Sequence, residues 1–204
     1  GGHGSIGTAN CAFTLMGQRT GAFETTISRD PTVFRDANLR TFDAVFLNNT
    51  VGNQFEDPEL RRSLVEFVYG GGGLMGVHGT SVAFTRWPGA HEDWPEFGRM
   101  LGARGASHQD ANERVLIRLD DRTHPLNLPF GSNDFEYADE FFRFRDAYSR
   151  KRARVLLSID NEQSARLQGV DRIRRFRDDD DYALAWVRNY GRGRVFYSTI
   201  AHNP

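Results

Sequence analysis

The stretch DPELRRSLVEFVYGGGGLMGVHG, residues 57–79, combines the signals of a helix with those of a buried strand. Asp57 is a typical helix N-cap, Pro58 suits the first helical position, and Gly70 is typical of a helix end. After the helix, GLMGVHG (73–79) has the length and composition of a buried strand that runs into a sharp turn. The apolar residues that share one face of the predicted helix are Leu60, Leu64, Phe67 and Val68.

A second apolar run, DAVFLNN (43–49), precedes this helix and also has the length of a buried strand. The order strand–helix–strand favours a right-handed βαβ unit in a parallel sheet. We therefore predict an α/β fold with a mostly parallel central sheet.

The rest of the chain predicts further elements of the same kind and no linker between domains. We expect one domain over residues 1–204. The further predictions are a helix over 8–20, a strand over 22–30, a short helical link over 36–42, a helix near 94–102, strands over 113–120 and 154–160, and two final strands joined by a hairpin at Gly191–Gly193.

Composition excludes several classes of protein. The formal net charge is -1 over 204 residues, so we expect no binding to nucleic acid or to acidic membranes. The sequence contains no apolar run of about 20 residues, so no bilayer-spanning helix is predicted. A single cysteine, Cys11, rules out an internal disulfide. We expect a soluble protein, cytoplasmic or periplasmic, and a domain clipped at both ends from a longer chain.

Polar residues follow the predicted strands. Ligands of parallel α/β folds bind beyond the carboxyl ends of the strands, where the sequence places His3, Asn49, His78 and His202. The GVHG segment around His78 has the shape of a nucleophile elbow, with glycines that relieve crowding at the turn. An imidazole cannot replace a cysteine thiolate in acyl transfer, so we expect no glutaminase activity.

Several ordered motifs carry a resemblance to a known family. They are FDAVFLNNT (42–50), GGGLMGVHGTS (71–81), WPEFGRMLGARGASH (94–108), THPLN (123–127), DEFFRF (139–144) and GRGRVFYSTIAH (191–202). Together they resemble the ThuA-like (trehalose utilisation) family of the class I glutamine amidotransferase-like superfamily. The resemblance implies a flavodoxin-like three-layer sandwich with a mostly parallel sheet. It also implies a role in disaccharide use through 3-keto-sugar intermediates.

The same resemblance marks candidate site residues, and the strand-end position of Asn49 and the aromatic ring of Trp87 add two more. We expect the catalytic residues to be His78, Glu140, His108 and His202. For substrate binding we expect His3, Asn49, Asp139 and Trp87, whose indole could stack on a sugar ring. Glu140 lies beside two phenylalanines and could be shielded from water and act as a general acid, or it could pair with Arg143; both alternatives stay open.

Three functions remain open at this stage. The first is an enzyme that acts on a carbohydrate, in particular a 3-keto glycoside, by His/Glu acid–base chemistry. The second is a zinc-dependent hydrolase that uses His3, His78, His108 and His202 as ligands. The third is a non-catalytic sugar-binding or accessory domain, with fused domains or a second copy of the chain as further partners.

Overall fold

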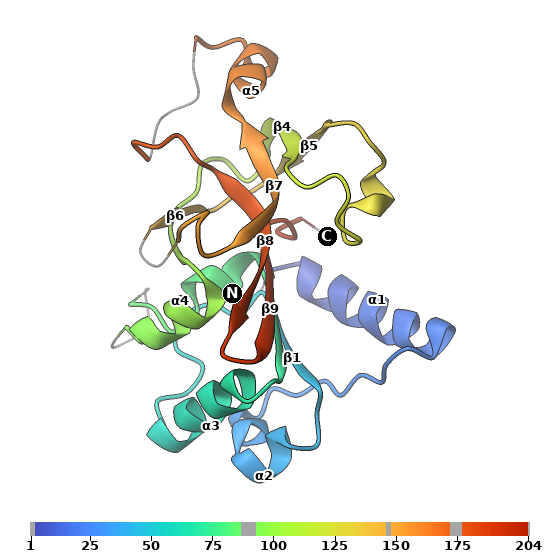
Figure 1. Ribbon diagram of the computed structural model, residues 1–204, viewed down its shortest axis with the longest axis vertical. Coiled ribbons are helices and arrows are strands. Elements are labelled where there is room, and N and C mark those ends of the chain that lie inside the picture. The colour runs from blue at the N-terminus through green and yellow to red at the C-terminus, as the bar shows by residue number, and fades with distance from the viewer. Residues whose placement is uncertain (1–2, 87–92, 146–147, 172–176, 204) are drawn as a thin grey trace.

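The computed structural model describes residues 3–86, 93–145, 148–171 and 177–203 (Figure 1). Short 3₁₀ turns lie at Pro31–Phe34, His78–Val82 and Leu128–Phe130. The helices are α1 (Ser5–Thr20), α2 (Asp36–Leu39), α3 (Pro58–Tyr69), α4 (Pro95–Leu101) and α5 (Asn161–Gln168). The strands are β1 (Ala44–Asn48), β2 (Gly73–Val77), β3 (Arg104–Ser107), β4 (Glu113–Leu119), β5 (Phe135–Asp139), β6 (Arg143–Arg145), β7 (Arg154–Asp160), β8 (Ala183–Tyr190) and β9 (Gly193–Ser198).

The main sheet is mixed, which corrects the prediction of a mostly parallel one. Its strand order is β1-β2-β9-β8-β7-β4-β5, and β3 pairs with β6 in a separate ribbon. The pairs β1–β2 and β2–β9 are parallel, whereas β9–β8, β8–β7, β7–β4 and β4–β5 are antiparallel. Parallel neighbours need a crossover of a dozen or more residues, usually a helix. The chain between β4 and β5 contains one 3₁₀ turn and no α-helix, and these two strands pair antiparallel.

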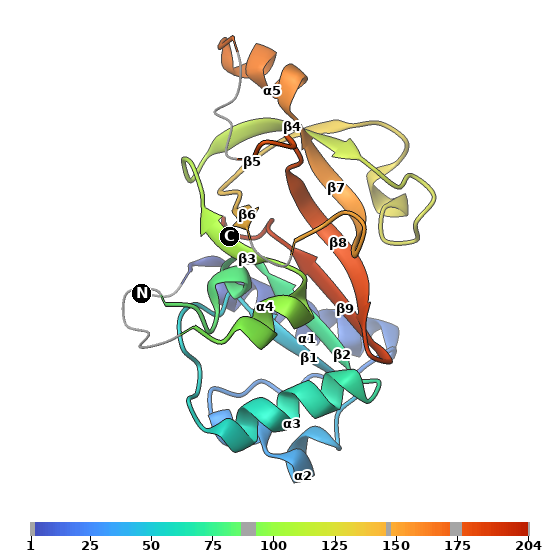
Figure 2. The same cartoon turned by 60° about the vertical axis from the view of Figure 1, so that its left-hand side comes forward.

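The helices cover the parallel half of the sheet on both faces (Figures 1 and 2). Phe13 of α1 packs on Phe46 of β1, with ring centroids 4.4 Å apart. On the other face, α3 and α4 contact β9. At the antiparallel end, α5 packs mainly against β4. The predicted three-layer sandwich therefore describes the parallel half alone.

The βαβ unit that the sequence predicts is present as β1–α3–β2. Asp57 accepts a hydrogen bond from the backbone N–H of Glu59, and α3 ends at Gly70. Leu60, Leu64 and Val68 are buried, as their shared helix face requires. The N-cap, the apolar face and the terminal glycine thus act as their chemistry predicts.

The predictions outside this unit hold with one exception. The hairpin after β8, the strands β4 and β7, and the helices α1, α2 and α4 agree with the sequence. The segment 22–30 is extended but forms no strand, since in the described part of the chain it has no β-partner. Alternating residues alone do not make a strand without a neighbouring one. None of the helices in the described ranges is long and apolar enough to cross a bilayer.

Candidate functional site

The carboxyl ends of the three parallel strands meet at one edge of the sheet. In the register of these strands, Asn48 of β1 lies opposite Val77 of β2, and Val77 lies opposite Ser198 of β9. The residues that follow, Asn49, His78 and Thr199, therefore leave the sheet side by side. This edge is where ligands bind in parallel α/β folds.

The turn after β2 holds His78 in a strained conformation. Its φ is 41°, in the left-handed region that non-glycine residues rarely adopt. A Cβ at Gly76 would lie 2.6 Å from Thr80, and one at Gly79 would lie 2.7 Å from Val51. The two glycines thus leave room for the tight turn, as the elbow motif predicts, and the turn places the imidazole beyond the sheet.

The His78 imidazole is completely buried, and its surroundings select one tautomer. Nδ1 lies 2.9 Å from the backbone carbonyl oxygen of Thr199. Because a carbonyl oxygen only accepts, Nδ1 carries the proton and Nε2 presents a lone pair. Burial lowers the pKa of His78 to about 4, although the hydrogen bond to Thr199 opposes this change. The ring is therefore neutral near pH 7.

Glu140 lies where three histidines converge. Its Oε1 is 3.3 Å from Nε2 of His78, and its Oε2 is 3.2 Å from Nδ1 of His108. Nε2 of His202 lies 4.0 Å from the same Oε2. The Glu140 side chain is 12 % exposed, His108 is 35 % exposed and His202 is 26 % exposed, so these three are open to a ligand.

The alternative pairing of Glu140 with Arg143 is not what the structure shows. The guanidinium of Arg143 binds Glu113 instead, at 2.6 Å, and both side chains are buried. Arg143 also donates a hydrogen bond to the carbonyl oxygen of Phe141. In the described part of the chain, the ionisable side chains within 4.0 Å of Glu140 are histidines.

Asp139 holds the segment that carries His202. Its carboxylate is buried and accepts hydrogen bonds from the backbone N–H groups of Ala201, His202 and Asn203, and from that of Glu140. All of these contacts lie within the protein. Asp139, which the sequence suggested for substrate binding, therefore fixes the positions of two candidate site residues in this structure.

Asn49 connects three segments at the same edge of the sheet. Its amide nitrogen donates to Ser5 Oγ and to the carbonyl oxygen of Ala201, and its amide oxygen accepts from the backbone N–H of Gly79. The side chain is buried. Asn49 thus links the start of α1, the His78 turn and the end of the chain after β9.

His3, His78 and His202 form a compact group. Their ring centroids lie 4.9 to 5.2 Å apart. One ring nitrogen from each residue lies within 4.8 Å of the corresponding nitrogen of the other two. Burial and the neighbouring His202 lower the pKa of His3. The three rings offer a donor set that suits a transition-metal ion.

The structure therefore brings together His3, His78, His108, Asp139, Glu140 and His202, with Asn49 beside them. Trp87 lies outside the described residues. Sequence reasoning missed Thr199, which orients His78 and also accepts the backbone N–H of Phe142. It also missed Tyr197, whose hydroxyl donates to the carbonyl oxygen of His78. Both lie in the closing YSTIAH segment, which was the available signal.

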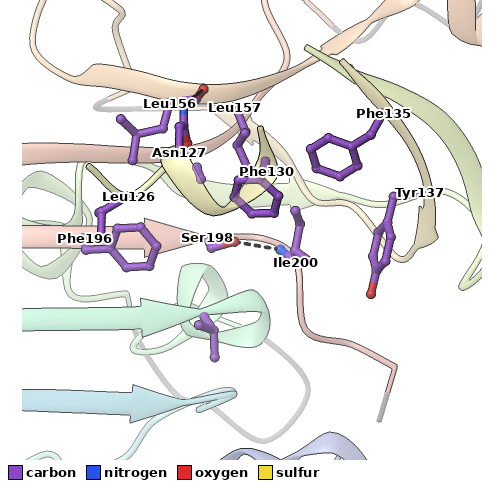
Figure 3. Close-up of a pocket in the computed structure, with 12 residues that line it drawn as sticks. Leu126, Asn127, Phe130, Phe135, Tyr137, Leu156, Leu157, Phe196, Ser198 and Ile200 are labelled. Atoms are coloured by element: carbon purple, nitrogen blue, oxygen red, sulfur yellow. Dashed lines mark hydrogen bonds between the residues drawn. The ribbon is translucent and has the colours of Figure 1, made fainter. Parts of the chain in front are cut away.

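An apolar pocket of about 380 Å³ lies next to this site (Figure 3). The pocket lies on the face of the sheet that α1 also covers. Phe196, which lines the pocket, is in register with Met75, and Met75 is in register with Phe46, so these side chains share one face. Leu126 and Phe130 from the loop between β4 and β5, together with Phe135 and Tyr137 of β5, complete the lining. None of its described lining residues is a histidine or a carboxylate, so the ionisable groups gather at the strand ends instead.

Comparison with solved structures supports the fold. A ThuA-like protein from Bacteroides uniformis matches with a TM-score of 0.74 and 19% identity, over 98% of this chain and 76% of that one. A ThuA-like protein from Parabacteroides merdae matches with a TM-score of 0.66 and 17% identity, over 98% and 75%. A protein described as cytoplasmic, from Salmonella typhimurium, gives 0.60 and 17%, over 92% and 74%.

No curated protein is significantly similar in sequence. The sequence model of the ThuA family, described as trehalose utilisation, matches residues 1–204. This match spans the whole sequence and includes every residue of the site described above. The chain therefore belongs to the ThuA family, which implies a carbohydrate-related role.

Proposed function

We propose that this protein is an enzyme that cleaves an oxidised sugar, a 3-keto glycoside, by acid–base chemistry and without glutaminase activity. One observation carries the proposal: His78, His108 and His202 all approach the carboxylate of Glu140. A carboxylate and imidazoles in contact are side chains that can act as the base and the acid of a reaction. Family membership supplies the class of substrate.

The chemistry of a 3-keto glycoside fits this set of groups. The ketone at C3 makes the hydrogen on C2 acidic, and the glycosidic oxygen leaves from C1, which is β to the ketone. A base removes the C2 proton, and the electron pair moves into a C1–C2 double bond as the C1–O bond breaks. An acid protonates the departing oxygen. The reaction therefore needs one base, one acid and an electrophile that faces the ketone oxygen.

The exposure of each side chain supports the following roles. Glu140 is partly exposed and takes the C2 proton, whereas the more exposed His108 protonates the leaving oxygen. His78 has no exposed surface, so we expect it not to contact the sugar and to act from behind Glu140 instead. Asp139 and Asn49 act as positioning residues, because their hydrogen bonds hold the surrounding backbone.

The test is to offer the purified protein 3-keto-trehalose and a 3-keto glucoside, and to follow release of the leaving sugar. We expect His108→Gln to lower kcat by about 10²- to 10⁴-fold, the range for a lost general acid. His124→Gln is the matched control, since His124 is partly exposed, accepts a hydrogen bond from the backbone N–H of Leu126 and is not one of the histidines that approach Glu140.

Two results would overturn the assignment. Equal turnover by the His108→Gln and His124→Gln variants would remove His108 from the chemistry. Binding of the keto sugar, measured by calorimetry, with no turnover of it would instead favour the non-catalytic accessory domain.

A further inference from the structure

We propose that His3, His78, His202 and Glu140 form a binding site for one divalent transition-metal ion, with zinc as the first candidate. The proposal concerns the same site as the proposed function and deepens it. Binding of the ion is argued from these four residues alone. Its use in the reaction rests on the proposed function.

The first argument is the spacing of the donor atoms. One nitrogen from each of the three histidines lies within 4.8 Å of the other two. Tetrahedral zinc, with bonds of about 2.1 Å, places its nitrogen ligands about 3.4 Å apart, so each ring would need to move inward by less than about 1 Å. His202 is 26 % exposed and His3 is only partly buried, so both rings have room to adjust toward the fixed His78.

The second argument is an unsatisfied lone pair. In the described structure Nε2 of His78 is buried and has no hydrogen-bond partner. It faces Oε1 of Glu140 at 3.3 Å, so two electron-rich atoms oppose each other. A buried ring nitrogen without a hydrogen-bond partner destabilises the folded protein. A cation bound to both atoms would satisfy them together.

The third argument concerns the ring nitrogens that would point away from the ion. Histidines that bind metals usually donate the N–H of their other nitrogen to a carbonyl or carboxylate oxygen. Nδ1 of His78 has such a partner in the carbonyl oxygen of Thr199, at 2.9 Å. Nδ1 of His202 lies 3.2 Å from the amide oxygen of Asn203, which leaves its Nε2 on the side of Glu140. Two of the three rings are thus oriented as ligands.

His108 differs from these three histidines. Its Nδ1 lies 3.0 Å from the carbonyl oxygen of Gln109, and His108 is not part of the compact group. It contacts Oε2 of Glu140, at 3.2 Å, whereas His78 faces Oε1. The structure therefore separates a ligand group, His3, His78 and His202, from a histidine that remains available for proton transfer.

A metal ion would also fill a gap in the proposed chemistry. Backbone N–H groups in the turn after His78 are another means of stabilising the enolate oxygen, but the N–H of Gly79 already donates to Asn49. The residues Gly79–Val82 are buried as well. An ion at the histidine group would supply the electrophile for the ketone oxygen.

The experiment measures the metal directly, on protein from which any polyhistidine tag has been removed. We expect about one equivalent of metal per chain by elemental analysis. After chelation, we expect saturable binding of Zn²⁺ by calorimetry and a tetrahedral visible spectrum with Co²⁺. His3→Ala and His202→Ala should each weaken Zn²⁺ binding by at least about tenfold. His78 is not used for this test, because removing a fully buried ring could unfold the protein.

Two control variants make the result specific. His124→Ala should leave Zn²⁺ binding unchanged, and so should His108→Ala, which removes a Glu140 contact but no ligand. No saturable binding of Zn²⁺, Co²⁺ or Mn²⁺, or equal affinity in the His3→Ala and His202→Ala variants, would overturn the site. Metal-free protein that still cleaves the keto sugar at the full rate would overturn the ion's catalytic use and leave the proposed function standing. Stoichiometric binding of the metal without any cleavage of the keto sugar would support the metal site and overturn the proposed function.

Discussion

Two glutamates that are shielded from water, Glu113 and Glu140, have different kinds of partner. Glu113 lies 2.6 Å from the guanidinium of Arg143, and both side chains are nearly free of solvent. Glu140 lies three residues before Arg143 in the sequence, yet the ionisable groups that approach it are imidazoles. An arginine is always charged, whereas the charge of a histidine depends on its surroundings.

This difference separates a structural carboxylate from a chemical one. The permanent charge of Arg143 holds Glu113 in place, which suits a contact that joins β4 to β6. Among the residues that the structure describes, Glu140 has no permanent cation beside it, so its carboxylate is available to a substrate or to a bound cation. In a chain whose basic residues are almost all arginines, the histidines beside Glu140 are the exception that indicates function.

The largest effect is expected when Glu140 alone loses its charge. Glu140→Gln keeps the shape of the side chain but removes the base, so kcat on a 3-keto glycoside should fall by about 10²- to 10⁴-fold. The free energy of unfolding should change by less than about 1 kcal/mol, because no permanent cation is left unpaired. Turnover assays and chemical denaturation measure the two quantities. A destabilised but active variant would contradict the comparison.

The same substitution at Glu113 should have the opposite consequence. Glu113→Gln leaves the Arg143 guanidinium buried without its counter-ion, which costs about 3–5 kcal/mol of folding stability. Turnover per folded molecule should stay close to that of the parent protein. Urea denaturation, with activity normalised to the folded fraction, checks both statements.

A double variant separates the effect of the unpaired charge from the effect of altered packing. Replacing Glu113 and Arg143 together by methionine removes both charges and should recover most of the stability, since apolar side chains can replace a buried ion pair. A double variant as unstable as Glu113→Gln would show that the loss comes from packing and not from the unpaired charge.

A smaller effect is expected from Asp139, which contacts Glu140 and His202 only through their backbone N–H groups. Asp139→Asn replaces one of the two oxygens that accept backbone N–H groups of the 201–203 segment by an NH2 group that cannot accept them. We expect a loss of about 1–3 kcal/mol in stability. Turnover should fall by about tenfold, the equivalent of 1.4 kcal/mol, because His202 and Glu140 shift. A drop in activity as large as that of Glu140→Gln would place Asp139 in direct contact with the substrate.

The sequence alone determined the local parts of this protein. The N-cap, the apolar face and the terminal glycine of α3 were readable because neighbouring residues decide them. The same holds for the elbow at His78, where Gly76 and Gly79 are required by contacts within the turn and with adjacent strand ends. Histidines at strand ends also indicated the position of the site.

The tertiary structure decided which strands pair and what surrounds Glu140. The sequence could not show that β4, β5, β7 and β8 join the sheet antiparallel, because register depends on strands far apart in the chain. Nor could it choose between Arg143 and the histidines as partners of Glu140. Arg143 is close in sequence, but it lies on β6 and meets Glu113 there, whereas the histidines arrive from three separate segments. Electrostatic partners are set by distance in space, and in a folded chain that distance is fixed by long-range packing.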